Sequence, residues 1–234
     1  MEKLEHSIIG IMGKTGTGKT VLAKKALKNL RSYIIVDVQA EYTQGIIFED
    51  TDEILEFIEQ WKNPKIIFRP ANDESQERFL EQIIKRKNNY TLILEEVDHW
   101  CDPYKIDPIL YDFLRYGRHK GRNLIWISRN AAEVSRKLTR LTHLMFTYLQ
   151  TEPIDLEYLN KFQFNKEIDK LGQYEYAYWL QSVDKDREIE LLNIFDEKPF
   201  ESVSVPAETT GGGRLSRNPD KDRMPMTARK RLPF

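Results

Sequence analysis

The stretch GIMGKTGTGKTVL, from Gly10 to Leu22, decides the fold of this chain. It joins an apolar run that begins near Ile8 to a segment, Val21 to Leu30, with apolar residues at helical spacing. Between them, Gly13 to Thr20 fits the pattern G-x-x-x-x-G-K-[ST] at every position. A strand, a glycine-rich turn and a helix in this order predict a phosphate-binding loop. The alternative is a flexible connector with no ligand.

The residue types of this loop suit a nucleotide and a metal ion. Glycines let the backbone curl so that N–H groups face phosphate oxygens, and the helix that follows adds its positive dipole end. We expect Lys19 to contact the β and γ phosphates of ATP and the Thr20 hydroxyl to ligate Mg²⁺. The predicted nucleotide-binding residues are Gly13, Lys14, Thr15, Gly16, Thr17, Gly18, Lys19, Thr20 and Val21.

A pair of acids follows a second apolar run, in TLILEEVDHW (Thr91–Trp100). If this run is a central strand, Glu95 and Glu96 emerge at its carboxyl end, where ligands bind in open α/β sheets. Because side chains alternate along a strand, we expect the two carboxylates to point to opposite sides. Glu95 is then the acid on the metal side and Glu96 the general base for an attacking water. The alternative is an acidic strand end exposed to solvent.

Strands and helices alternate along most of the chain, which predicts a doubly wound, mostly parallel α/β sheet. Three helices are indicated by apolar faces. The first includes Ile54 to Trp61, with Asp50 as its cap. The second includes Phe79 to Ile84 and is led by Asp73 as its cap, with Gln76 at capping-box spacing. The third begins at Asp107–Pro108 and stops at Gly117. The predicted strands are Ser7–Met12, Tyr33–Val38, Lys65–Arg69, Tyr90–Glu96, Asn123–Arg129 and His143–Leu149.

The C-terminal part differs from the rest. Tyr174–Leu180 and Glu188–Ile194 predict a short β hairpin, and apolar periodicity stops near Pro199. We therefore expect an ATPase domain over residues 1–198 and a flexible, disordered, basic tail over residues 199–234. The tail carries seven basic and four acidic residues from Glu201 onward, which suits either a solvated end or an arm that contacts DNA or a protein partner.

Composition limits the other possibilities. The chain has 234 residues, a net charge of −1 and one cysteine, Cys101, so an intrachain disulfide is excluded and a reducing compartment is expected. The first residues lack a signal peptide's apolar segment, and no apolar run approaches the roughly 20 residues of a membrane span. We expect a soluble protein of the cytoplasm. His99, Cys101 and His119 form no metal-binding pattern, and His143 is expected to be structural.

Four motifs in order resemble the FtsK–HerA superfamily of P-loop ATPases. They are GKTGTGKT (Gly13–Thr20), IIVDVQAEY (Ile34–Tyr42), LILEEVD (Leu92–Asp98) and GRHKGRNLIWISRN (Gly117–Asn130). The small size resembles the viral and prophage genome-packaging branch. This resemblance implies a RecA-like core, Mg²⁺-dependent ATP hydrolysis and pumping of double-stranded DNA. It also implies a homo-oligomeric ring, a hexamer or a pentamer, in the host cytoplasm or at the virion's packaging vertex, with capsid or membrane vertex proteins as partners.

The same resemblance implies roles for arginines and for two further acids. Arg129 stands where cellular members usually carry the glutamine that senses the γ-phosphate. Arg118 or Arg122 is the candidate for a finger that reaches a neighbouring subunit's nucleotide, or else belongs to a surface charge pair or a DNA-contacting patch. Asp37 and Glu41 match the acidic second strand and either orient the site or cap a loop, the latter being favoured for Glu41.

Basic residues at helical spacing follow the ISRN strand tip. Arg136, Lys137 and Arg140 either grip DNA phosphates without reading bases or form a solvated helix face.

Two other functions remain open from the sequence. One is a P-loop kinase, in which Arg115, Arg118 and Arg122 belong to a lid over a small-molecule or nucleotide acceptor. The other is a nucleotide-gated adaptor that binds a capsid or membrane partner through the basic tail. The Glu95–Glu96 pair favours an ATPase over a kinase, because a second carboxylate suits activation of water.

Overall fold

Apolar runs of the sequence form one mostly parallel sheet in the computed structural model, which describes residues 7–86, 88–162, 167–180 and 230–231. The strand order is β3-β4-β2-β5-β6-β1-β7-β8-β9. All neighbours from β3 to β7 pair in parallel, whereas β8 is antiparallel to β7 and β9 is antiparallel to β8. The strands are β1 (Ile8–Met12), β2 (Tyr33–Val36), β3 (Ile46–Phe48), β4 (Lys65–Phe68), β5 (Tyr90–Leu94), β6 (Arg122–Ser128), β7 (Leu144–Thr147), β8 (Glu175–Leu180) and β9 (Lys230–Arg231).

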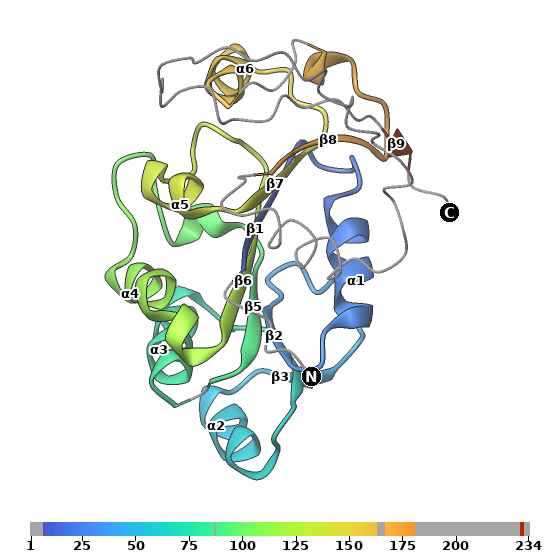
Figure 1. The fold of residues 1–234 in the computed structure, drawn as a ribbon. Helices are drawn as coiled ribbons and strands as arrows, with labels where there is room; N and C mark the ends of the chain where they lie inside the picture. Colours follow the sequence, from blue (N-terminus) through green and yellow to red (C-terminus); the bar gives the residue numbers. More distant parts are fainter. Residues whose placement is uncertain (1–6, 87, 163–166, 181–229, 232–234) are drawn as a thin grey trace, which may run out of the picture.

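Helices cover both faces of this sheet, as the doubly wound prediction requires (Figure 1). Helix α1 lies on one face, and α2 to α5 lie on the other, with α6 near the β8 end. The helices are α1 (Lys19–Asn29), α2 (Thr51–Gln60), α3 (Asp73–Arg86), α4 (Pro108–Tyr116), α5 (Arg136–Leu141) and α6 (Pro153–Asn160), with short 3-10 turns at η1 (Val97–His99), η2 (Arg118–Lys120) and η3 (Ile168–Lys170).

Strand direction determines where the functional loops lie. β6 lies between β1 and β5, with Leu124 level with Ile8 on one side and with Leu92 on the other. Because these strands are parallel, the loops that follow β1, β2, β5, β6 and β7 all leave the sheet at the same edge. The strand ending in ISRN therefore lies beside the strand that carries the two acids.

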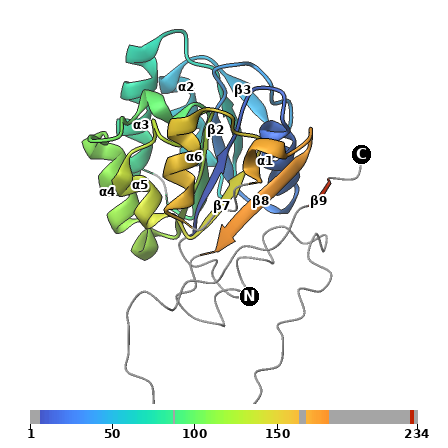
Figure 2. The same ribbon diagram turned by 90° about the horizontal axis from the view of Figure 1, so that it is seen from above.

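Two apolar cores, one on each face, hold the helices to the sheet. Helix α1 packs through Leu22, Ala23 and Leu27 against residues that include Ile9 and Ile11. The opposite core is larger and takes in apolar residues of α2, α3, α4 and α6. Figure 2 shows α3, α4 and α5 on the side of the sheet opposite α1. Residues of each buried strand alternate between the two cores, which explains why the strands read as continuous apolar runs.

The six strands expected from the sequence are confirmed within two residues at each end, and β3 was missed. β3 is only three residues long, and its Ile46 and Ile47 are 50% and 43% exposed at the sheet's edge. Asp50 and Asp107 cap α2 and α4 as expected.

Two details of the expected helices were wrong. Asn72, not Asp73, accepts the N–H of Ser75 at 2.9 Å in the first turn of α3. Trp61 was expected on the buried face of α2, but α2 ends at Gln60. Trp61 is 57% exposed and stacks on the Phe57 ring.

The C-terminal region matches the prediction in part. β8 forms where the first hairpin strand was expected, and it pairs antiparallel with β7, with Phe146 opposite Tyr178. The second hairpin strand, Glu188–Ile194, and most of the tail lie outside the described residues. Within the tail, Lys230–Arg231 form β9 against Glu175 and Tyr176, so these two residues depart from the predicted disorder.

A tight contact inside the sheet yields a stability prediction. Gly10 lies level with Trp126, and a methyl group on Gly10 would overlap the indole, with Cε2 only 2.6 Å away. We expect Gly10→Ala to lower the free energy of unfolding by about 1–3 kcal/mol in a urea titration, because a buried indole cannot move aside cheaply.

The double variant Gly10→Ala/Trp126→Phe is the control. Its smaller ring should restore part of the loss, although it gives up the 3.0 Å hydrogen bond from Trp126 Nε1 to Thr142 Oγ1. Unfolding of Gly10→Ala at the wild-type urea midpoint would contradict the contact.

Candidate functional site

Neighbouring strands fix the start of the glycine-rich loop. The N–H of Gly13 donates to the Ser128 carbonyl at 3.3 Å, and that of Lys14 to the Leu149 carbonyl at 3.1 Å. Gly13 has φ +147°, and a side chain there would meet Tyr148 Cβ at 2.5 Å. Glycine is therefore required by close approach as well as by backbone conformation.

Lys19 begins helix α1 and bends back over the loop. Its Nζ donates to the carbonyls of Gly13 at 2.6 Å and Lys14 at 2.9 Å. Gly18, the N-cap, has φ +119° and offers no side-chain acceptor, so the first N–H groups of α1 keep no partner within the helix. Burial, and then the nearby Arg129, lower the pKa of Lys19, while Glu95 and Glu41 act against this. Ammonium, amides and helix dipole together form an anion-binding corner.

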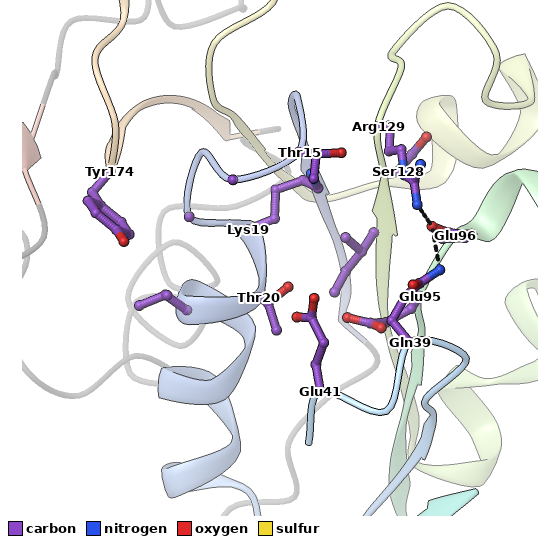
Figure 3. Close-up of a pocket in the computed structure, with 14 residues that line it drawn as sticks. Thr15, Lys19, Thr20, Gln39, Glu41, Glu95, Glu96, Ser128, Arg129 and Tyr174 are labelled. Atoms are coloured by element: carbon purple, nitrogen blue, oxygen red, sulfur yellow. Dashed lines mark hydrogen bonds and ion pairs between the residues drawn. The ribbon is translucent and has the colours of Figure 1, made fainter. Parts of the chain in front are cut away.

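One pocket joins this corner to the acids (Figure 3). Nine of the residues predicted from the sequence line it, together with Gln39, Glu41, Ile127, Ser128 and Tyr174. Its full lining is Thr15, Gly16, Gly18, Lys19, Thr20, Val21, Gln39, Glu41, Glu95, Glu96, Ile127, Ser128, Arg129 and Tyr174.

Both acids face the pocket, so the expectation that strand alternation would separate them is wrong. β5 ends at Leu94, and Glu96 has a left-handed backbone, φ 50° and ψ 58°. Alternation applies only within the strand, and this turn brings Glu96 round to the same side as Glu95. The Glu96 carboxylate forms an ion pair with Arg129 and accepts from Gln39 Nε2 at 3.3 Å.

Glu95 is the buried member of the pair, only 5% exposed. Burial raises its pKa to about 7, with smaller contributions from the charges of Glu41, Asp37 and Glu96. The nearby Tyr42 phenol acts in the opposite direction, although its hydroxyl completes no hydrogen bond of good geometry. A carboxyl in this condition exchanges its proton near neutral pH and gains strongly from a nearby cation.

The two acids of the second strand take different roles, and the loop-capping role favoured for Glu41 belongs to Asp37. Asp37 is 1% exposed, accepts the N–H groups of Glu41 and Tyr42, and pairs with Arg69 at 3.2 Å. It is therefore the residue that caps the loop. Glu41 is exposed, lines the pocket, and carries its carboxylate toward Thr20 and Glu95 (Figure 3).

Arg129 is held at its backbone by a residue that the sequence did not indicate. Gln150, fully buried, donates from Nε2 to the Arg129 carbonyl at 3.1 Å. It follows β7, one residue after the Leu149 carbonyl that binds the glycine-rich loop. The loop and the Arg129 tip are thus both tied to residues 149–150.

The two finger candidates lie at the opposite edge of the sheet. Arg122 begins β6 and pairs in register with Tyr90, at the amino ends of the strands. It is 1% exposed and lies over the Phe113 ring, so burial excludes it as a finger. Arg118 is exposed in η2 and stays a prediction, since its place can serve only another chain's site.

The predicted DNA-binding residues all fall on α5, outside the pocket. Arg136 is half-buried and stacks on the Tyr158 ring, 3.7 Å from its centroid, which fits an anchor better than a phosphate contact. Lys137 and Arg140 are exposed. Ser135 caps this helix by accepting the N–H of Lys137.

The donors around Thr20 suit a hard cation. Thr20, Glu41 and Glu95 offer only oxygen atoms, and Mg²⁺ in phosphate sites takes few protein ligands beside water and phosphate. Among the described residues there is no cluster of three or more His, Cys, Asp or Glu that would hold a metal by itself. Nor does any described helix have the length and apolarity to cross a membrane.

Comparisons with known proteins agree on the fold. Neither the protein-family models nor the curated proteins include a match to this chain. Among solved structures, the genome packaging NTPase B204 from Sulfolobus turreted icosahedral virus 2, in complex with ATP-gammaS, is 20% identical, with a TM-score of 0.60 over 75% of this chain and 92% of that one. VirB4 of Thermoanaerobacter pseudethanolicus is 13% identical, with a TM-score of 0.50 over 76% of this chain and 88% of that one. The chain therefore shares its P-loop NTPase fold with these two proteins, and this confirms the doubly wound, mostly parallel sheet that the sequence predicted.

Proposed function

We propose that this protein is an Mg²⁺-dependent ATPase that pumps double-stranded DNA, as the motor of a viral genome-packaging system. The observation that carries the proposal is the single pocket in which Lys19 and the start of α1 face the Glu95–Glu96 pair. The likeness in fold to B204, a genome packaging NTPase, supports the choice of reaction and of biological role.

Some residues of the pocket would bind the nucleotide and the metal ion, and another would accept the proton of the attacking water. Lys19 and the loop amides would hold the phosphates. The Thr20 hydroxyl would ligate Mg²⁺, and Glu41 and Glu95 would hold its water shell. The metal ion would neutralise charge on the phosphate oxygens. Glu96 would take a proton from water as its oxygen bonds to the γ-phosphorus and the bond to the β-phosphate oxygen breaks, which gives ADP and inorganic phosphate.

A bound phosphate would compete with the Glu96 carboxylate for Arg129. The Glu96 carboxylate accepts hydrogen bonds from Arg129 and Gln39, and these occupy oxygen atoms that it would need for binding the attacking water. A phosphate that drew Arg129 away would free Glu96 to bind water, and the arginine would then stabilise the transferred group. We propose that this exchange couples nucleotide binding to formation of the base.

A defined path leads from Arg129 to the surface. The N–H of Ala132 donates to the buried Asp155 at 2.7 Å, which ties the segment after β6 to α6. That segment continues through Ser135 into α5 and its exposed Lys137 and Arg140. Movement at Arg129 would pass along it to DNA phosphates.

The first prediction concerns turnover on DNA. We expect double-stranded DNA to stimulate ATP hydrolysis several-fold, and the stimulation to fall steeply with salt because phosphate contacts release counterions. Lys19→Ala should reduce hydrolysis to background with or without DNA. The measurement is phosphate release across a salt titration.

Matched variants and alternative outcomes sharpen this test. Lys137→Gln and Arg140→Gln should each weaken the stimulation, whereas Lys120→Gln, an exposed lysine at the opposite sheet edge, should not. Turnover that ignores DNA at every salt concentration would contradict pumping. Phosphate found on an acceptor other than water would favour a kinase, and tight ATP binding without turnover would favour an adaptor.

The second prediction separates the base from the binding residues. Glu96→Gln keeps the side chain's size but cannot accept a proton, so kcat should fall about a hundredfold or more. The Kd for ATP should stay within a few-fold of wild type, because Glu96 lies beyond the phosphate-holding residues. Glu133→Gln, an exposed acid outside the pocket, is the control. Wild-type kcat in Glu96→Gln would remove Glu96 from the proposed reaction.

The third prediction follows from the Glu95 pKa of about 7. Protonated Glu95 cannot support Mg²⁺, so below pH 7 the advantage of Mg²⁺ over EDTA in ATP binding should shrink by up to about tenfold per pH unit. Above pH 7 the advantage should level off. The measurement is the ratio of the two Kd values at pH 6, 7 and 8.

Glu95→Gln supplies the baseline for this titration. The nucleotide itself also takes up a proton near this range, and the variant subtracts that contribution. We expect its ratio to be small and to follow the nucleotide alone. An identical pH dependence in wild type and variant would show that Glu95 takes no part in metal binding.

A further inference from the structure

Tyr174 lies on the side of the P-loop away from the acids. Figure 3 shows its ring to one side of Lys19 and the Glu95–Glu96 pair with Arg129 to the other. Tyr174 nonetheless lines the same pocket as Lys19 and Thr20. It directly precedes β8, more than a hundred residues from the loop, and the sequence marked it only as the start of a predicted strand, with no role at the site.

This segment is fastened to the P-loop itself. The N–H of Tyr174 donates to the Thr17 carbonyl at 2.9 Å, and Gln173 Nε2 donates to the Gly16 carbonyl at 3.3 Å. The ring lies against Gly18, where an added methyl group would come within 2.9 Å of Tyr174 Cδ1. The position of the aromatic ring is therefore set by the phosphate-binding loop.

The backbone of Tyr174 adds a second observation. Its φ of +63° is in the left-handed region, which a bulky side chain rarely adopts. Such a conformation costs free energy and concentrates at ligand sites, where the surrounding contacts enforce it. Glycine or asparagine would adopt it more easily, so packing alone does not account for a tyrosine here.

The direction in which a nucleotide would lie across the pocket determines which residues its base would meet. The terminal phosphate must lie toward Glu96, so the phosphate chain runs across Lys19 and the nucleoside emerges on the Tyr174 side. Val21, in the first turn of α1, also lines the pocket and is 40% exposed. A flat aromatic ring and an exposed aliphatic side chain would give a base two apolar surfaces.

We propose that Tyr174 is the stacking platform for the nucleobase, with Val21 as a second contact, a role that rests on the proposed function of the P-loop. Recognition by stacking would favour purines over pyrimidines, because the larger ring overlaps more, and would distinguish adenine from guanine only weakly.

The test compares a ligand that has a base with one that has none. Kd values for ATP and for inorganic tripolyphosphate, both with Mg²⁺, would be measured by calorimetry on the full chain. Tyr174→Ala should weaken ATP binding about tenfold or more and leave tripolyphosphate within about twofold. Tyr174→Phe should bind ATP nearly as wild type does. Tyr104→Ala, which removes a 90% exposed tyrosine outside the pocket, is the matched control.

Each outcome separates the base platform from the phosphate site. Unchanged ATP affinity in Tyr174→Ala would overturn the platform, and so would an equal loss for both ligands, which would show that Tyr174 only supports the loop. Wild-type protein that binds neither ligand would overturn the proposed function itself. Equal affinity for ATP and CTP in wild type would contradict the purine preference.

Discussion

Parallel pairing of β1 with both β6 and β7 is the constraint on which the site depends. It places the Ser128 and Leu149 carbonyls where the N–H groups of Gly13 and Lys14 can reach them. The first turn of the loop is therefore shaped by its neighbours in the sheet as much as by its own glycines. Since the loops after these parallel strands leave at one edge, the same pairing brings Arg129 within reach of Glu96.

The pocket is lined by two basic residues, Lys19 and Arg129, and three acidic ones, Glu41, Glu95 and Glu96, and some of these charges are poorly solvated. Burial raises the pKa of Glu95 and lowers that of Lys19, so each group holds its charge at a cost. Arg129 and Glu96 balance each other's charge through their ion pair. A triphosphate would place negative charge beside Lys19, and a divalent cation would place positive charge beside the carboxylates. Binding of both together would therefore stabilise the charged forms of Lys19 and Glu95, which burial alone disfavours.

Local motifs predicted the parts of the site that are contiguous in the chain. The P-loop and the Glu95–Glu96 pair each lie within one short stretch, and their residue types report their chemistry directly. Gln39, Gln150 and Tyr174 were missed because their residue types report no site chemistry by themselves. Only tertiary contacts bring them to Glu96, Arg129 and the P-loop. Burial of Arg122 was equally invisible, since an arginine at the start of a strand has no pattern that marks it as covered.

Topology also separates the two arginines that resemblance assigned to the nucleotide. Arg129 lies at the carboxyl edge of the sheet and can act within its own chain, whereas Arg118 precedes β6 at the amino edge. If Arg118 acts on a nucleotide, the amino edge of one subunit must meet the carboxyl edge of the next. A two-fold pair apposes the same surface of both subunits, so it does not join opposite edges of the sheet through one contact. A head-to-tail contact does, and where the rotation between subunits closes, its repetition gives a ring, which would suit the proposed DNA pump.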